Sequence, residues 1–519
     1  MLRSTGLLVI ASLLSQALAL VVQVALAHRF GAGVEVDAYV GAFALPALVE
    51  AFALAGISQL LLPVLVIRFE RGEGREAWRV LATLLTTLGG GLLVLSLPVA
   101  LVRGFLVTAL TPGLTAPTQQ LAADYLAVIF PGLSFGIAVV LLTQPYHAER
   151  RFGFPALLGV LSQGIPLVAV LSLSARMGLW SLILGTLAAK IAVAIALAIG
   201  LKRRGAMLRP RLDVAHPDVR RMAWLVLPMM LAVASSRVNS VVDRFFISFL
   251  GPGKLAALGY ADRVVAVVLA VMVSPITSVL YPTLAGFEAR RDREGLFRAI
   301  DRGLRAVIAG MLPVAVTVVT LAPLALVVLF EHGRFSALDT KRVSGVLACY
   351  AGVILLSGVG SLLVRGFYAV GNTRDPMIWG GIVPIVLNVV MDALVFRRFD
   401  VYGIAAVTSL NMALVLPVLY FLLRRRLSAV RIAGWSFFLM RAVLGGGVMG
   451  AVLHAGASRL NPGAGVFEGT LSLTLLALAG LATYVTVALW LRLEPVPEVS
   501  TRLLAALRRR YLTVTEAFR

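Results

Sequence analysis

Long apolar stretches, separated by short polar segments, run through most of the chain. A helix needs about 20 apolar residues to cross the hydrocarbon core of a bilayer. Fourteen stretches reach that length, and we predict that each forms a transmembrane helix. They are residues 5–28, 37–67, 80–102, 121–146, 154–175, 177–201, 221–250, 255–286, 304–330, 343–370, 376–396, 401–423, 433–458 and 467–491. The pattern predicts an all-α polytopic membrane protein, because the strands of a membrane barrel would alternate apolar and polar residues.

Composition supports this class. Of the 519 residues, 60% are hydrophobic and 14% are charged. A soluble globular domain has about 45–50% apolar and about 25% charged residues, and a disordered chain has still fewer apolar ones. Both classes are therefore excluded.

The excess of basic residues is best explained by topology. The net charge is +22, and Lys and Arg concentrate in alternate loops. With the N-terminus inside, the inside segments hold about three times as many basic residues as the outside segments, which predicts cytoplasmic N- and C-termini. We therefore expect no nucleic-acid partner. Cys349 is the only cysteine, so no intramolecular disulfide forms. The sequence does not determine the oligomeric state, and our expectation is a monomer.

A weak internal repeat divides the chain into two lobes. Residues 30–33 (Phe-Gly-Ala-Gly), followed by Asp37, are matched by residues 250–253 (Leu-Gly-Pro-Gly), followed by Asp262. The repeats start at the first and seventh spans, which cross in the same direction, so we expect two six-helix lobes and alternating access. We predict an N-terminal lobe at 1–201, a cytoplasmic inter-lobe linker at 202–220, a C-terminal lobe at 221–424, two extra helices at 433–491 and a basic cytoplasmic tail at 492–519.

Five residues of the C-terminal lobe form a candidate cation site. They are Asp243, Asn388, Asp392, Ile404 and Thr408. Asn388 and Asp392 are four residues apart and share one helix face. The donors are all oxygen atoms, with Ile404 offering a backbone carbonyl, which suits a hard alkali cation such as Na⁺. A proton site and a hydrogen-bonded polar cluster are the alternatives.

Several short segments carry a family resemblance by their joint order and spacing. The segments are 28–33 (His-Arg-Phe-Gly-Ala-Gly) with Asp37, 151–156 (Arg-Phe-Gly-Phe-Pro-Ala), 260–263 (Tyr-Ala-Asp-Arg), 331–335 (Glu-His-Gly-Arg-Phe), 366–369 (Gly-Phe-Tyr-Ala) with 373–376 (Thr-Arg-Asp-Pro), and Asn388 with 403–405 (Gly-Ile-Ala). Over about residues 4–430 the chain resembles the MurJ (MviN) family of lipid II flippases, within the multidrug/oligosaccharidyl-lipid/polysaccharide exporter superfamily.

The resemblance implies a fold and a function. It implies a V-shaped two-lobe bundle with a cationic central cavity for the lipid II headgroup and a tail groove along the last two spans. It implies a flippase, and not an enzyme, that carries this peptidoglycan precursor from the inner to the outer leaflet of a bacterial cytoplasmic membrane. The five-residue cation site matches a sodium site of some members, so we expect coupling to a cation or to the membrane potential. The alternatives are a flippase for another polyprenyl-diphosphate-linked oligosaccharide, a cation-coupled exporter, and a regulatory or scaffold protein that has lost transport.

We expect five residues to contact the substrate: Arg263, Arg237, Glu50, Gln16 and Asp37. Arginine stays charged and binds phosphate oxygens bidentately, so it suits a diphosphate that leaves water. Arg263 matches a cavity arginine of the family. Gln16, Glu50 and Ala51 stand where the family usually has further arginines, and Arg237 is a candidate substitute for them. The alternatives are that Arg263 pairs with Asp262 or Glu50, and that Arg237 pairs with an acid such as Glu50.

Overall fold

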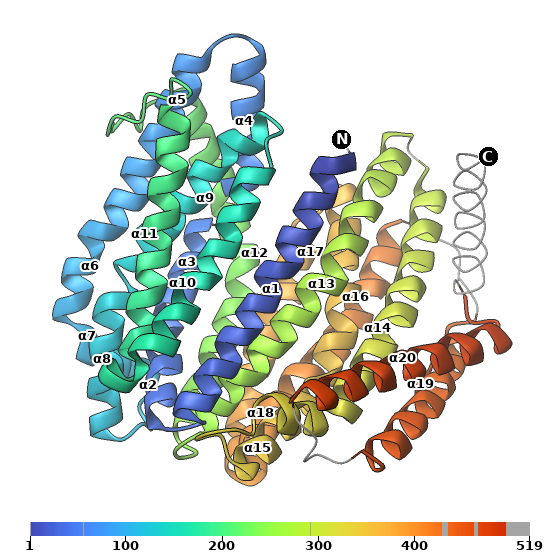
Figure 1. Ribbon diagram of the computed structural model, residues 1–519. Coiled ribbons are helices and arrows are strands. Elements are labelled where there is room, and N and C mark those ends of the chain that lie inside the picture. The colour runs from blue at the N-terminus through green and yellow to red at the C-terminus, as the bar shows by residue number, and fades with distance from the viewer. Residues whose placement is uncertain (1, 55–56, 291, 428–433, 461–465, 495–519) are drawn as a thin grey trace, which may run out of the picture. The chain divides into compact units, whose positions relative to one another are not determined.

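A computed structural model describes residues 2–54, 57–290, 292–427, 434–460 and 466–494, with their side chains except at 2–9, 57–59, 227–236, 273–286 and 288–289. Within these ranges all regular structure is helical (Figure 1). The helices are α1 (Leu2–Phe30), α2 (Val34–Ala42), α3 (Ala44–Leu54), α4 (Ile57–Glu70), α5 (Gly74–Leu84), η1 (Leu85–Gly90), α6 (Gly91–Leu101), α7 (Arg103–Leu110), α8 (Ala116–Ile129), α9 (Gly132–Ala148), α10 (Gly153–Met177), α11 (Trp180–Lys202), α12 (Pro217–Ser248), α13 (Lys254–Ala289), α14 (Arg293–Leu329), α15 (Ala337–Cys349), α16 (Ala351–Ala369), α17 (Arg374–Met377), η2 (Ile378–Ile382), α18 (Val383–Arg426), α19 (Trp435–Ala457) and α20 (Val466–Trp490).

The all-α membrane class is confirmed. Among the described residues, 12 helical segments are long and apolar enough to cross a membrane. One of them, Arg374–Arg426, contains both the eleventh and the twelfth predicted span. Helix α12 covers the seventh predicted span, and the side chains at its centre lie outside the described set. The 12 segments are therefore compatible with the predicted fourteen spans without confirming that number.

A break at Asp400 separates the two spans within α18. Its backbone is left-handed, with φ 58° and ψ −157°. A non-glycine residue adopts positive φ only when other contacts compensate the steric cost. Here Asp400 Oδ1 accepts from the Val401 N–H at 2.7 Å, and Oδ2 accepts from Lys254 Nζ at 2.5 Å. These bonds hold the turn between the two helical halves.

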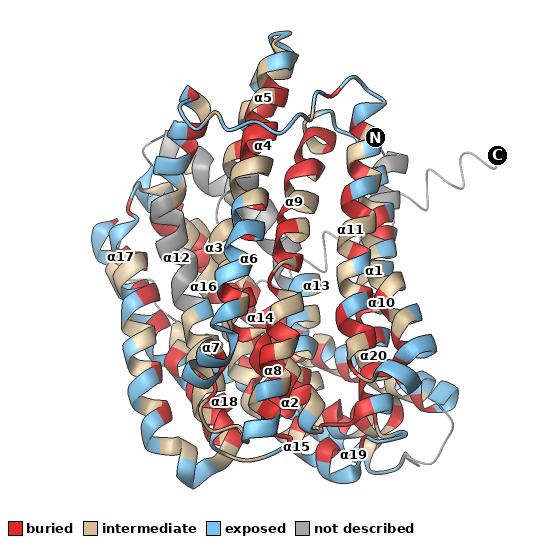
Figure 2. Cartoon of the chain, turned by 90° about the vertical axis from the view of Figure 1, so that its left-hand side faces the viewer, coloured by how far each residue is buried: buried red, intermediate tan, exposed pale blue. Residues whose placement is uncertain are grey.

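The chain forms two compact units. The first consists of Met1–Tyr260, Glu331–Asp339 and Ile385–Ile404. In it α1 packs on α10, α10 on α11, and α9 on α4 and α11. Aromatic side chains of α8, α9 and the turn between them fill its core, and Figure 2 shows the buried residues along these two helices. The hydroxyl of Tyr146 donates to the carbonyl of Leu197 at 3.0 Å, which joins α9 to α11.

The second unit consists of Ala261–Phe330, Thr340–Pro384 and Ala405–Arg519. In it α14 packs on α16, α19 and α20, and α19 and α20 lie side by side (Figure 1). Gly446 of α19 lies against Leu312 of α14, where small residues let membrane helices approach closely. The hydroxyl of Tyr484 donates to the carbonyl of Ala309 at 2.8 Å, which joins α20 to α14.

A buried carboxylate also holds α19 onto α14. Asp301 Oδ1 accepts from the Trp435 indole at 2.8 Å and from the Tyr420 hydroxyl at 3.0 Å. Its Oδ2 accepts from Arg305 Nε at 3.1 Å. The Arg305 guanidinium lies over the rings of Trp435 and Phe438. We call these five residues the Asp301 cluster.

The boundaries of the lobes, at 201 and 221, remain predictions. Of the predicted basic tail at 492–519, residues 495–519 lie outside the described residues.

Candidate functional site

The first unit contains a buried cluster of two carboxyls and one amide. Asn388 and Asp392 are 0% exposed and Asp243 is 5% exposed. Asn388 Nδ2 donates to Asp243 Oδ1 at 2.6 Å and to Asp392 Oδ2 at 2.9 Å. Both amide hydrogens of Asn388 are thus used, one for each carboxyl. The bond to Asp243 joins the first half of α18 to α12.

The same cluster contains oxygen atoms without a partner. Within the described part of the chain, Asn388 Oδ1 and Asp392 Oδ1 are buried and accept no hydrogen bond. Burying an unpaired carboxylate is costly, and a bound cation or proton relieves that cost. No group of three or more His, Cys, Asp or Glu side chains among the described residues is arranged to hold a metal ion. The donor set, which is oxygen only, fits a monovalent alkali cation.

The other two residues of the predicted cation site lie in the second half of α18. Ile404 is buried and Thr408 is half-buried, one turn later. Both make interactions of their own. Thr408 belongs to the second unit, so its membership of the site stays a prediction.

The two predicted substrate arginines are exposed and unpaired. Arg237 lies on α12 in the first unit, and Arg263 lies on α13 in the second. Neither side chain forms a hydrogen bond or an ion pair with any residue in the described ranges. Gln16, on α1, is half-buried. Within the described part of the first unit, Arg237 forms no ion pair with Glu50. The alternatives that pair Arg263 with Asp262 or Glu50 stay predictions.

Glu50 has a different neighbour, which the sequence did not indicate. A methyl group on Gly136 of α9 would lie 3.4 Å from Lys190 Nζ and 3.8 Å from Glu50 Oε1. The acid of α3 and the lysine of α11 therefore face the same glycine inside the first unit. The only sign in the sequence that these two residues are neighbours is that each lies as a charge within a predicted span.

Asp37 caps a helix. It is 1% exposed, and its two carboxylate oxygens accept the backbone N–H groups of Gly253 at 2.5 Å and Ala256 at 2.7 Å. These N–H groups begin α13 and have no partner within the helix. The placement gives Asp37 a structural role, while its predicted contact with substrate stays untested.

Parts of three of the motifs that carry the resemblance, at 28–37, 260 and 331–335, lie around the Asp37 cap. The Tyr260 hydroxyl donates to the Gly31 carbonyl at 2.8 Å, and the Arg334 N–H donates to the His28 carbonyl at 3.0 Å. Gly31 has φ +61°, and a Cβ there would lie 2.5 Å from the Arg334 carbonyl oxygen, so only glycine fits. We call residues 28–37, 253–260 and 331–335 the junction.

Ion pairs fix the end of the predicted linker to the first unit. Arg68 of α4 bonds Asp218 at 2.8 Å, and Arg79 of α5 bonds Asp213 at 2.5 Å. His216 Nε2 lies 3.1 Å from Glu76 Oε2, and its Nδ1 accepts from the Asp218 N–H to cap α12. The sequence analysis describes this segment only as basic. It does not predict that Asp213 and Asp218 form ion pairs with arginines of α5 and α4.

Comparison with known proteins identifies similar chains over nearly the whole length. A family model described as "Lipid II flippase MurJ" matches residues 26–475. A probable lipid II flippase MurJ of Vibrio cholerae is 27% identical over 518 residues, covering 94% of this chain and 95% of that protein. The lipid II flippase MurJ of Burkholderia cenocepacia is 26% identical over 464 residues, covering 85% and 87%.

Solved structures give the same fold. A lipid II flippase MurJ in an inward closed conformation superposes with a TM-score of 0.76 at 20% identity, covering 92% of this chain and 98% of that one. An inward-facing multidrug resistance MATE family transporter of the MOP superfamily superposes with a TM-score of 0.65 at 15% identity, covering 80% and 94%. At these low sequence identities, the structural similarity shows a shared fold and does not show a shared function.

Proposed function

Because the chain belongs to the MurJ family, whose model matches residues 26–475, we propose that it moves lipid II from the inner to the outer leaflet of a bacterial cytoplasmic membrane. It is a lipid II flippase, a transporter and not an enzyme. We further propose that it works by alternating access as a monomer, with both termini on the cytoplasmic side. The charge asymmetry of the loops supports the orientation.

Arg263 is the residue that we propose to contact the diphosphate of the substrate. Its guanidinium is exposed on α13 and has no ion pair within the described ranges, so it is free to bind an anion. Arg237 is exposed and unpaired in the same way on α12. A charge-assisted bond from an arginine that stays ionised can replace the water lost by a phosphate.

The experiment for the flippase is complementation. The chain is expressed in a bacterium depleted of its own lipid II flippase, beside Arg263→Ala and, as a control, Arg459→Ala in a predicted outside loop. We expect the native chain and Arg459→Ala to restore growth, and Arg263→Ala to restore it poorly. Equal rescue by Arg263→Ala would remove this residue from the substrate site.

We also propose that the Asp243–Asn388–Asp392 cluster binds Na⁺ and couples its movement to transport. The two orphaned oxygens support this, since a cation would satisfy both. One charge that crosses a potential of 100 mV releases about 2.3 kcal/mol. That energy is enough to bias two conformations by roughly 50-fold at about 1.4 kcal/mol per decade.

Sodium binding is tested by thermal unfolding of the purified protein in NaCl and in KCl at equal ionic strength. A ligand at 100 times its Kd stabilises the folded state by about 2.7 kcal/mol, so we expect a higher melting temperature in NaCl. Asp392→Asn should abolish the difference, and Asp124→Asn, which changes a surface ion pair, should keep it. A sodium effect that persists in Asp392→Asn would refute the site, and dependence on pH in place of sodium would indicate a proton.

One observation favours a second candidate, a flippase for another polyprenyl-diphosphate-linked oligosaccharide. Positions 50 and 51 carry Glu50 and Ala51, and Glu50 lies beside Lys190. A changed charge in this region would suit a different headgroup. Failed complementation by a well-expressed, membrane-inserted chain would favour this candidate.

A further inference from the structure

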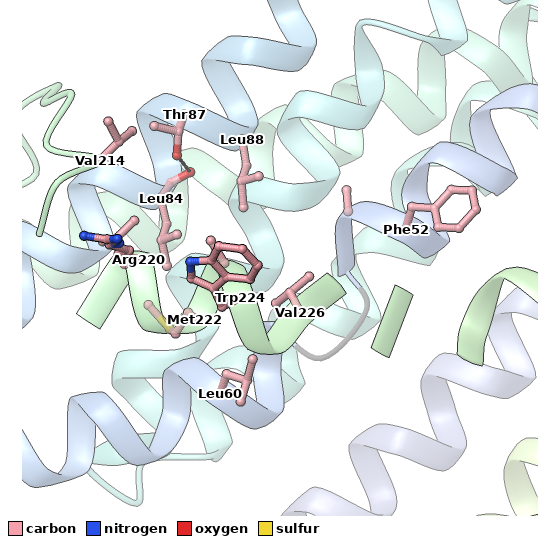
Figure 3. Close-up of a pocket in the computed structure, with 13 residues that line it drawn as sticks. Phe52, Leu60, Leu84, Thr87, Leu88, Val214, Arg220, Met222, Trp224 and Val226 are labelled. Atoms are coloured by element: carbon pink, nitrogen blue, oxygen red, sulfur yellow. Dashed lines mark hydrogen bonds between the residues drawn. The ribbon is translucent and has the colours of Figure 1, made fainter. Parts of the chain in front are cut away.

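The first unit has an apolar cavity that the proposed transport function does not use. Its volume is about 550 Å³, within the usual range of about 300–1,000 Å³ for small-ligand pockets. Phe52 of α3, Leu60 of α4 and Leu84 of α5 line it, together with Leu88 of η1 (Figure 3). The end of the linker and the first turns of α12 form the remaining wall, with Trp224 lying across it.

A cation without a partner lies at the rim of this cavity. The Arg220 side chain is exposed, lines the cavity and makes no ion pair within the described residues. The two arginines that reach the same linker segment, Arg68 and Arg79, are paired with Asp218 and Asp213. Those pairs hold the backbone next to Arg220 against α4 and α5, and the Arg220 side chain remains available for an anion.

The mouth of the cavity carries residue types that are typical of a membrane interface. Arg220 lies in the first turn of α12, which begins at Pro217, directly after the polar linker. Trp224, one turn further, is 69% exposed, and Leu225 beside it is also exposed. Tryptophan concentrates at the depth of the lipid headgroups, and an arginine one turn outside it would meet the phosphates.

We propose that this cavity binds an anionic glycerophospholipid, with an acyl chain among the apolar side chains and the headgroup phosphate on Arg220. The lipid comes from the leaflet on the linker side, which the loop charges predict to be cytoplasmic. An apolar cavity with one cation at its mouth matches the two ends of such a molecule. Neither of the proposed substrate residues, Arg237 and Arg263, lines this cavity, and the proposal does not depend on which lipid the protein transports.

Photo-crosslinking of the full chain in lipid nanodiscs tests the proposal. The probe is phosphatidylglycerol with a diazirine near the end of one acyl chain, and mass spectrometry locates the labelled peptides. Unlabelled phosphatidylglycerol or phosphatidylcholine competes. We expect labelling on the α3, α4 and α12 peptides that line the cavity. Both lipids carry a phosphate, but the choline cation of phosphatidylcholine offsets that charge near Arg220, so phosphatidylglycerol should compete about tenfold better.

Two variants and one matched control decide the outcome. Arg220→Ala should reduce the selectivity for phosphatidylglycerol about tenfold and keep the fold, because the side chain is exposed. Ala53→Phe should fill the cavity and remove the labelling. Arg221→Ala takes the same charge from the next position of α12, which does not line the cavity, and should label like the native chain. Equal loss in Arg220→Ala and Arg221→Ala would reduce the effect to general surface charge, and labelling outside these peptides would overturn the proposal.

Discussion

The buried carboxylate of Asp37 stabilises the start of a helix that is distant in the sequence, α13. Gly253, which it caps, lies 216 residues later in the chain. Both oxygens of the carboxylate accept backbone N–H groups of a helix start, where negative charge is also favoured by the helix dipole. Removing the side chain would leave two buried donors without partners.

We predict that Asp37→Ala lowers the free energy of unfolding by about 3 kcal/mol, since each charge-assisted bond contributes about 1.5–3 kcal/mol. Thermal unfolding in detergent measures the change. Asp124→Ala is the matched control, because its carboxylate pairs with Arg103 on the surface and should cost under about 1 kcal/mol. Equal losses in the two variants would contradict the capping role.

The sequence predicts neighbours on one helix better than neighbours on different helices, because helical spacing is fixed and helix packing is not. Asn388 and Asp392 were grouped correctly because a spacing of four places them on one helix face, and Asp243 joins them through a hydrogen bond. Asp37 was assigned to substrate because nothing local reveals a cap that belongs to a distant helix. Glu50 and Lys190 lie on different spans, and hydropathy does not fix how spans rotate against each other.

At the scale of elements, the spans followed directly from the sequence. A continuous apolar stretch must form a helix in lipid, since its backbone polar groups have no other partners there. The predicted gap between the eleventh and twelfth spans lies at the Asp400 break. What holds α19 to α14 was not foreseen, because the Asp301 cluster joins residues of three helices by long-range contacts.

We predict that Asp301→Ala lowers the free energy of unfolding by about 3 kcal/mol, because it removes the buried carboxylate that pairs with Arg305 and leaves that guanidinium the exposed Glu494 at 3.5 Å. The comparison is Glu294→Ala, which removes an acid from an exposed i,i+4 pair with Arg298 on the same helix. That control should cost less than about 0.5 kcal/mol. Both are measured by thermal unfolding, and a mild effect of Asp301→Ala would show that packing alone holds α19.

At the scale of the whole molecule, the loop charges predict orientation. We expect Arg211→Cys, in the linker, to react with a membrane-impermeant maleimide only from the cytoplasmic side. Arg459→Cys, after α19, should react from the opposite side. Both are made in a Cys349→Ala background, which removes the only native cysteine. Labelling of both positions from one side would contradict the predicted topology.

A chain of this kind can change its cargo without losing the segments by which it is recognised. The glycines and buried polar groups of the junction tolerate few replacements, because each is fixed by backbone conformation or by a buried bond. By contrast, the side chains of Glu50 and Arg237 form no hydrogen bond or ion pair among the described residues, and Ala51 has no polar group to fix. Selection can therefore alter substrate specificity while the junction motifs persist. Chains that share these motifs are better assigned to substrate classes by the charges at positions 50, 51 and 237.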